Sequence, residues 1–293
     1  MKKLSGNLRI ILLSVIILTA ICVTLFTVSL FVSYDQAINY FNGSLIYSIS
    51  KALAAITLIG IVVFTLMLPK NELSGDSPTT LPISIVSSLP AIALCAFSAS
   101  VFSGALKIAD NSKLFSIVCA VFSATSSVYF IFNCIFADSK NSVKVFLGYF
   151  LPLANILLIA ITYFDMSVSM NAPAKAFLNF AFISFALWSL LELRTMTEKR
   201  HPRAYFALGL ITTVLTSLAS IPWIIATLAG KLGKPIYPSY IIFNVTVFAL
   251  FVYVLTRMIV FVSARSLIER LSEQTYSDDT PEAQQEDNKS EEV

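Results

Sequence analysis

An all-α bundle of about eight transmembrane helices is the fold class that this sequence predicts, and three observations lead to it. Apolar residues make up 57% of the 293 residues and charged residues only 13%, about half the charge of a soluble globular domain. The apolar residues form runs of about 20, and such a run crosses a hydrocarbon core of about 30 Å as a helix. The runs lack the short alternating segments of an outer-membrane barrel, so helices must satisfy the backbone in lipid.

Eight runs are long and apolar enough to be membrane spans. They cover residues 8–32, 45–68, 83–106, 114–136, 145–164, 176–191, 204–230 and 240–262. The loops between them are too short for a soluble domain. We therefore expect residues 1–265 to form one transmembrane bundle and residues 266–293 to form a separate tail.

The first four spans differ in the residues they carry. The first follows Met1-Lys2-Lys3, but its apolar stretch is too long for a signal peptide and no Ala-x-Ala-like site precedes Tyr34, so it stays as an anchor. The second carries Lys51 a little below its outer end. The third and fourth have small residues at a spacing of four, which predicts close packing of helix backbones. These stripes are Ala96, Ser100 and Gly104, and then Cys119, Ser123 and Ser127.

The last four spans include the shortest one. The sixth lies between Lys175 and Arg194, and snorkelling of these two side chains makes it long enough to cross. The seventh has a third stripe of small residues, Gly209, Thr213 and Ser217. The eighth continues briefly as a helix over 263–271, after which the tail begins.

Basic residues in the short loops indicate the orientation. Twelve bases fall on one face of the bundle: Lys2, Lys3, Arg9, Lys70, Lys140, Lys144, Arg194, Lys199, Arg200, Arg203, Arg265 and Arg270. Six fall on the other: Lys51, Lys107, Lys113, Lys175, Lys231 and Lys234. The positive-inside rule places the richer face in the cytoplasm, so we expect both termini to be cytoplasmic.

The C-terminal tail is acidic. From Glu273 onward it has eight acids and one base, a net charge of −7 that leaves +10 for the rest of the chain. This composition, without an apolar period, predicts disorder from about Tyr276. The tail either keeps the terminus soluble or docks a protein partner. The basic body suits anionic lipid, whereas its scattered bases do not suit nucleic acid.

No cofactor, metal site or catalytic motif is expected. The cysteines Cys22, Cys95, Cys119 and Cys134 lie inside apolar runs without CxxC spacing, and the single histidine is His201 in a loop. The sequence has no HExxH, GxSxG or phosphate-binding glycine pattern. These features argue against an enzyme.

Polar side chains inside the spans are the candidate functional positions, because they are costly in lipid. They are Lys51, Asn133, Asn155, Asn179 and Asn244. The asparagines could line a pathway or join helices by hydrogen bonds. Their depths differ, so they do not converge on one site. None is a carboxylate near the midplane, which argues against a proton-coupled carrier.

Glu192 and Arg257 are a candidate ion pair. Spans six and eight both run inward, and the two residues lie at a similar depth, about one or two turns from the inner surface. The forked guanidinium of Arg257 suits a carboxylate. Arg194 is a local rival for Glu192, but it lies two positions along the helix and points to another face. The alternative outcome is that both charges snorkel to headgroups.

One stretch resembles a known group of proteins. Residues 163–173 (YFDMSVSMNAP) followed by Leu191-Glu192-Leu193-Arg194 are similar to uncharacterised multi-spanning membrane proteins of Gram-positive bacteria, over roughly residues 160–230. The resemblance implies the cytoplasmic (inner) membrane of a bacterium and no particular activity.

Three function classes stay open. The first is a small-molecule permease or the membrane subunit of a transporter, and the alternative to it is a non-catalytic scaffold, sensor or assembly factor that acts through partners. The third, less favoured, is an enzyme that acts on lipid-borne substrates. A permease requires a water-filled cavity near the midplane lined by Asn155 and neighbouring hydroxyls. A scaffold requires a packed interior and a groove for a partner.

Overall fold

The computed structural model describes residues 3–36, 39–68, 80–106, 113–136, 142–164, 172–197, 201–232 and 238–278. These ranges contain the helices α1 Lys3–Ser33, α2 Leu45–Met67, α3 Leu81–Phe102, α4 Lys113–Ile135, α5 Ser142–Gly148, α6 Phe150–Phe164, α7 Pro173–Met196, α8 Pro202–Leu228 and α9 Pro238–Asp278. They also contain a two-stranded antiparallel hairpin of β1 Tyr34–Asp35 and β2 Tyr40–Phe41.

Eight stretches of the described chain are long and apolar enough to cross a membrane, which confirms the predicted set of apolar helices. Their bounds differ from the predicted spans by a few residues. The largest difference is at the sixth, where α7 has 24 residues. At this length the helix needs no extension by snorkelling, and the Lys175 side chain is buried instead.

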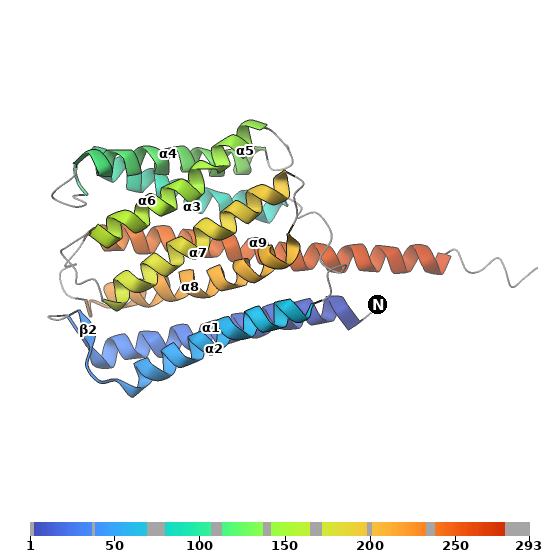
Figure 1. Cartoon of the computed structure of the whole chain (residues 1–293), viewed down its shortest axis with the longest axis horizontal. Coiled ribbons are helices and arrows are strands. Elements are labelled where there is room, and N and C mark those ends of the chain that lie inside the picture. Colours follow the sequence, from blue (N-terminus) through green and yellow to red (C-terminus); the bar gives the residue numbers. More distant parts are fainter. Residues whose placement is uncertain are drawn as a thin grey trace, which may run out of the picture.

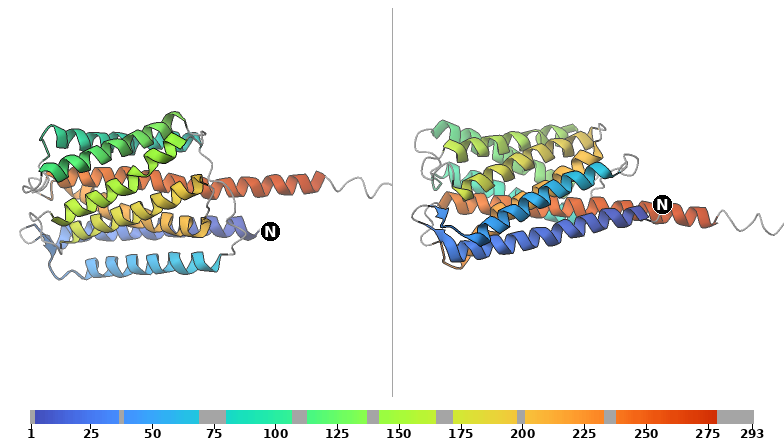
Figure 2. Two further views of the ribbon diagram at one scale, coloured as in Figure 1. Left: turned by 45° about the horizontal axis from the view of Figure 1, so that its top comes forward. Right: turned by 60° about the horizontal axis from the view of Figure 1, so that its bottom comes forward.

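The helices lie roughly side by side along one axis, and the chain turns back at each end of the bundle (Figure 1). The hairpin caps one end, which we call the hairpin end. The first described residues of α1 lie at the opposite end, where α9 also leaves the bundle (Figures 1 and 2). We call this the termini end.

Helices α8 and α9 form the centre of the bundle. Helix α8 packs against α1, α2, α7 and α9, and α9 also packs against α3. About two thirds of the apolar window of α8 (67%) and 61% of that of α9 are buried, against 28% for α2. Helices α1 and α2 form an outer layer on one side, and α4, α5 and α6 lie on the other (Figure 1).

The hairpin was not predicted from the sequence. Its turn includes Asn39 with a φ of 53°, and Gly43 follows with a φ of 54°. Its aromatic residues pack on the helix ends: Tyr34 lies 5.3 Å from Trp223 and Phe41 lies 3.9 Å from Tyr47, measured between ring centroids. The hairpin therefore joins α1, α2 and α8.

Two helices depart from the predicted outline. The fifth span is divided at Tyr149 into α5 and α6. Helix α9 has 41 residues, about 61 Å at 1.5 Å per residue, and it continues past the bundle (Figure 1). The predicted tail therefore begins as helix up to Asp278, and residues 279–293 lie outside the described chain.

Candidate functional site: a buried ion pair among four helices

Glu192 of α7 and Arg257 of α9 are close together inside the bundle. Arg257 Nη2 lies 2.7 Å from Glu192 Oε1, and the side chains of Arg257 and Glu192 are 2% and 3% exposed. Tyr253 bridges them, because its hydroxyl donates to Glu192 Oε1 at 2.9 Å and accepts from Arg257 Nε at 3.2 Å. The Nη2 contact is an ion contact without hydrogen-bond alignment.

The local sequence places these groups on facing surfaces. Tyr253 and Arg257 are four residues apart, so they share one face of α9. Trp188 and Glu192 have the same spacing on α7. Glu192 is four residues from the end of α7 at Met196, and Arg257 is seven from the end of its apolar stretch at Ala264. The pair therefore lies toward the termini end, about 6 to 10 Å from the ends of the apolar helices.

Helices α4 and α8 complete the surroundings with aromatic and amide groups. The Tyr129 hydroxyl lies close to Asn133 and Tyr253 and to both charges. The Trp188 ring centroid is 6.0 Å from that of Tyr253 and 5.6 Å from that of Tyr205. The pair is thus enclosed by side chains that combine apolar surface with a polar tip.

Several polar atoms around the pair have no hydrogen-bond partner within the described residues. They are Glu192 Oε2, Trp188 Nε1, and both Nδ2 and Oδ1 of Asn133. Buried polar atoms usually bond to protein or to ordered water. This surplus of bonding capacity distinguishes the cluster from an apolar helix contact.

Two glycines allow the helices to approach closely here. A Cβ on Gly209 of α8 would lie 2.3 Å from Met258 Sδ and 3.1 Å from Trp188 Nε1. A Cβ on Gly148, where α5 ends, would lie 2.2 Å from Leu193 Cδ2 and 3.2 Å from Tyr129 Cε2. Gly209 belongs to a predicted stripe of small residues and does lie in a helix contact, whereas Ala96 and Gly104 of the first predicted stripe are exposed.

The other candidate positions do not join this cluster, except Asn133. Lys51 is exposed on α2, and its Nζ lies 4.3 Å from the centroid of the Tyr47 ring. The Asn155 Nδ2 donates to the carbonyl of Leu151 in its own helix at 2.7 Å.

Asn179 and Asn244 lie elsewhere in the bundle. The Asn179 Oδ1 accepts from the Thr162 hydroxyl, which joins α7 to α6. Asn244 is buried near the start of α9. The asparagines are therefore spread over the bundle, as their depths in the sequence indicate.

Sequence reasoning missed the aromatic members of the cluster. Tyr253 makes both bridging hydrogen bonds, yet tyrosine in an apolar run is typical of core or of a membrane interface. The available signal is the i, i+4 spacing of Tyr253 from Arg257 and of Trp188 from Glu192. Counting four residues back from Arg257 and from Glu192 identifies Tyr253 and Trp188.

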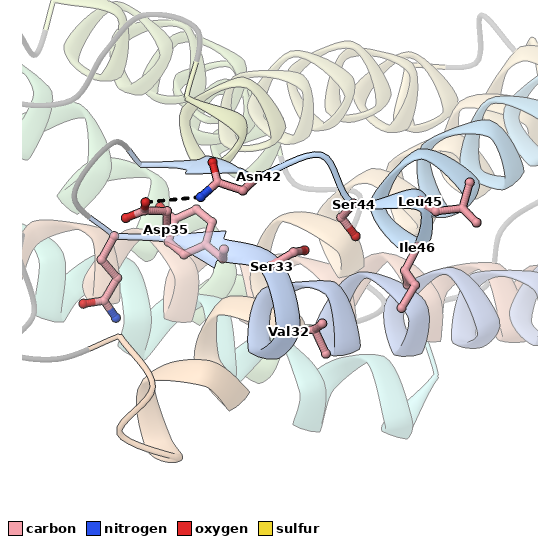
Figure 3. A pocket seen from close by; sticks show the side chains of 9 residues that line it. Val32, Ser33, Asp35, Asn42, Ser44, Leu45 and Ile46 are labelled. Atoms are coloured by element: carbon pink, nitrogen blue, oxygen red, sulfur yellow. Dashed lines mark hydrogen bonds between the residues drawn. The ribbon is translucent and has the colours of Figure 1, made fainter.

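Two cavities are lined by described residues. One is an open pocket of about 700 Å³ at the hairpin end, between the hairpin and the start of α2. Asn42 and Asp35 meet at its edge, where Asn42 Nδ2 donates to Asp35 Oδ2 at 3.3 Å (Figure 3). The other is a half-open groove of about 270 Å³ between α1, α8 and α9. Asn155 lines neither of these two.

Comparisons with protein-family models, with curated proteins and with solved structures find no match to this chain. Within the described residues no group of three or more His, Cys, Asp or Glu side chains is arranged to hold a metal ion. Function must therefore be inferred from the site itself.

Proposed function

We propose that this chain is a non-catalytic membrane protein, a scaffold, sensor or assembly factor that acts by binding partners. The observation that carries the proposal is how its buried polar residues are used. Glu192 and Arg257 form an ion contact and both hydrogen-bond to Tyr253, and the amide of Asn155 donates to its own helix. These groups support helix packing.

A permease would require polar groups that face a water-filled space near the midplane. Asn155 is the candidate nearest the middle of its span, and it is 1% exposed. The groove between α1, α8 and α9 lies at that depth, opens between helices and is lined mainly by apolar side chains. A surface of this kind does not suit a hydrated solute.

We place the protein in the cytoplasmic membrane of a bacterium, with both termini in the cytoplasm. The two-to-one excess of loop bases supports this orientation. Helix α1 begins at the end of the bundle at which α9 leaves it (Figure 1), which supports termini on the same side. Helix α9 extends beyond the bundle at this end (Figure 1), and the acidic composition of the residues after it suits a basic protein partner.

Cysteine accessibility distinguishes the partner-binding function from a permease. The four native cysteines are replaced by alanine, and Asn155→Cys is then introduced. A water-soluble, membrane-impermeant thiol reagent is applied to intact cells and to inside-out vesicles. We expect no labelling from either side, because a packed interior excludes the reagent.

Asn42→Cys in the same background is the matched control, since Asn42 is exposed beside the hairpin. It must react from one side only, which shows that the protein is folded and the reagent active. Labelling of Asn155→Cys from either side at a comparable rate reveals an aqueous path and supports the permease instead.

A further inference from the structure

The groove between α1, α8 and α9 runs along the helices. Its α1 wall includes Ile16, Ala20 and Thr24, and its α8 wall includes Thr213, Ser217 and Ile221. Within each wall the residues are four apart, so each row follows one helix face. Phe251 and Leu255 close the groove from α9. The groove therefore lies near the middle of all three apolar stretches.

The hydroxyl groups that line the groove offer little hydrogen bonding to a ligand. Thr19 donates to the Val15 carbonyl at 2.6 Å and Thr24 to that of Ala20 at 2.8 Å. On α8, Thr213 donates to the Gly209 carbonyl and Ser217 to that of Val214, both at 2.8 Å. The lining thus presents mostly methyl and methylene groups, and its complement is an uncharged apolar chain.

The width of the groove indicates whether a helix or a single hydrocarbon chain occupies it. From Ile16 to Thr24 the groove is about 12 Å long at 1.5 Å per residue. A volume of about 270 Å³ over that length corresponds to a cross-section about 5 Å wide, half the diameter of about 10 Å of a helix. The groove therefore encloses one hydrocarbon chain, whereas a helix would lie largely outside it.

A positive charge lies in line with the groove toward the termini end. Arg9 precedes Ile16 by seven residues and Ala20 by eleven, close to two and three helical turns, so the three share one face of α1. Arg9 is exposed, and so is Leu13 between it and the groove. Ala20 is about 16 Å from Arg9 along the helix, close to the half-thickness of about 15 Å of the hydrocarbon core.

We infer that this face of the bundle binds one anionic phospholipid of the leaflet at the termini end. The phosphate headgroup lies at Arg9, and one acyl chain follows Leu13 into the groove between α1, α8 and α9. The charge selects the headgroup, and the shape of the groove holds the chain end. The lipid site stands whether or not a protein partner binds elsewhere.

Native mass spectrometry of the full chain tests this site. The purified protein is given equal amounts of phosphatidylglycerol and phosphatidylcholine with identical chains, and retained lipid is counted. We expect one phosphatidylglycerol to be retained about fivefold over phosphatidylcholine, the effect of one basic residue at the membrane surface. Arg9→Gln removes this preference but keeps some retention of both lipids. Ala20→Phe and Thr24→Phe each fill the groove and abolish retention of both.

Two control variants keep the test specific. Ile21→Phe adds the same bulk on the other side of α1, and Arg194→Gln removes another exposed arginine at the termini end. Both must retain lipid like the unmodified chain. Retention unchanged in Ala20→Phe and Thr24→Phe, or a phosphatidylglycerol preference that survives Arg9→Gln, overturns the site. A protein dimer that the groove-filling changes disrupt also overturns it, since a second copy then occupies the groove.

Discussion

Glu192 and Arg257 are two single residues with a large expected effect on the free energy of unfolding. Each charge alone would be costly inside the bundle, whereas together they carry no net charge and share the Tyr253 hydroxyl. Replacing a buried pair by apolar residues is often neutral, but removing one partner leaves a charge without compensation. The pair therefore specifies how α7 meets α9 more than it adds net stability.

A double-mutant cycle measures this coupling. Glu192→Gln and Arg257→Gln should each lower the free energy of unfolding by about 3–5 kcal/mol, because each leaves one buried charge unpaired. The double change should cost less than the sum. Unfolding in detergent with increasing dodecyl sulfate, followed by circular dichroism, provides the measurement.

Arg194→Gln is the control for the cycle, because Arg194 is exposed and lies two residues from Glu192. Its effect should stay within about 0.5 kcal/mol. If the two glutamine changes were strictly additive, the pair would have no energetic role.

At this scale the sequence proposes Glu192 and Arg257 as a pair but does not identify the aromatic groups that surround them. Glu192 and Arg257 stand out because they are charged within apolar runs, and their depths follow from helix direction. Tyr129, Trp188 and Tyr253 do not stand out, because an aromatic side chain in a span has many ordinary roles. The role of their polar atoms around the ion pair is evident only from the packing of α4, α7 and α9 against one another.

Single helices show which local patterns are informative. The stripe Gly209, Thr213 and Ser217 predicts a close helix contact, and Gly209 does lie against Met258 and Trp188. The break at Tyr149 and the hairpin are not predictable from the local sequence. Beside the break, Gly148 is required because Leu193 and Tyr129 pack against it, and both residues are remote in sequence. The strands have two residues each, which is too short for a periodic pattern.

Two helical glycines provide a matched pair for testing the contact of α8 with α9. Gly209→Ala places a Cβ 2.3 Å from Met258 Sδ, so Met258 must move and the free energy of unfolding should fall by about 1–2 kcal/mol. Gly60→Ala meets nothing closer than Phe64 at 3.9 Å. It should instead raise that energy by up to about 1 kcal/mol, through helix propensity alone.

Shortening the methionine is the second arm of this test. Met258→Ala removes the atoms that the new Cβ would meet, so Gly209→Ala should cost less in that background, measured by the same unfolding titration. Equal effects of Gly209→Ala and Gly60→Ala would mean that α8 and α9 are not in close contact at Gly209.

For the whole molecule, hydropathy and helix length suffice to predict eight apolar helices, because each must cover the same hydrocarbon thickness. The order in which those helices pack is not predictable in this way. Lipid-facing and partner-facing surfaces are both apolar, so the apolar stretches of α2 and α9 have nearly equal mean hydropathy although 28% of one and 61% of the other are buried. The central position of α8 and α9 follows from tertiary contacts alone.

The orientation of the bundle in the membrane is the prediction that belongs to the whole molecule. The loop 195–203 (TMTEKRHPR) and the N-terminus carry six of the twelve bases that indicate a cytoplasmic termini end. Asn42, beside the hairpin at the opposite end, should then face outward. In a background without native cysteines, Asn42→Cys should react with an impermeant thiol reagent in intact cells, and Ser290→Cys should react only after the membrane is opened. Because all spans are connected, these two positions report on the whole topology, and the reverse pattern of labelling would invert it.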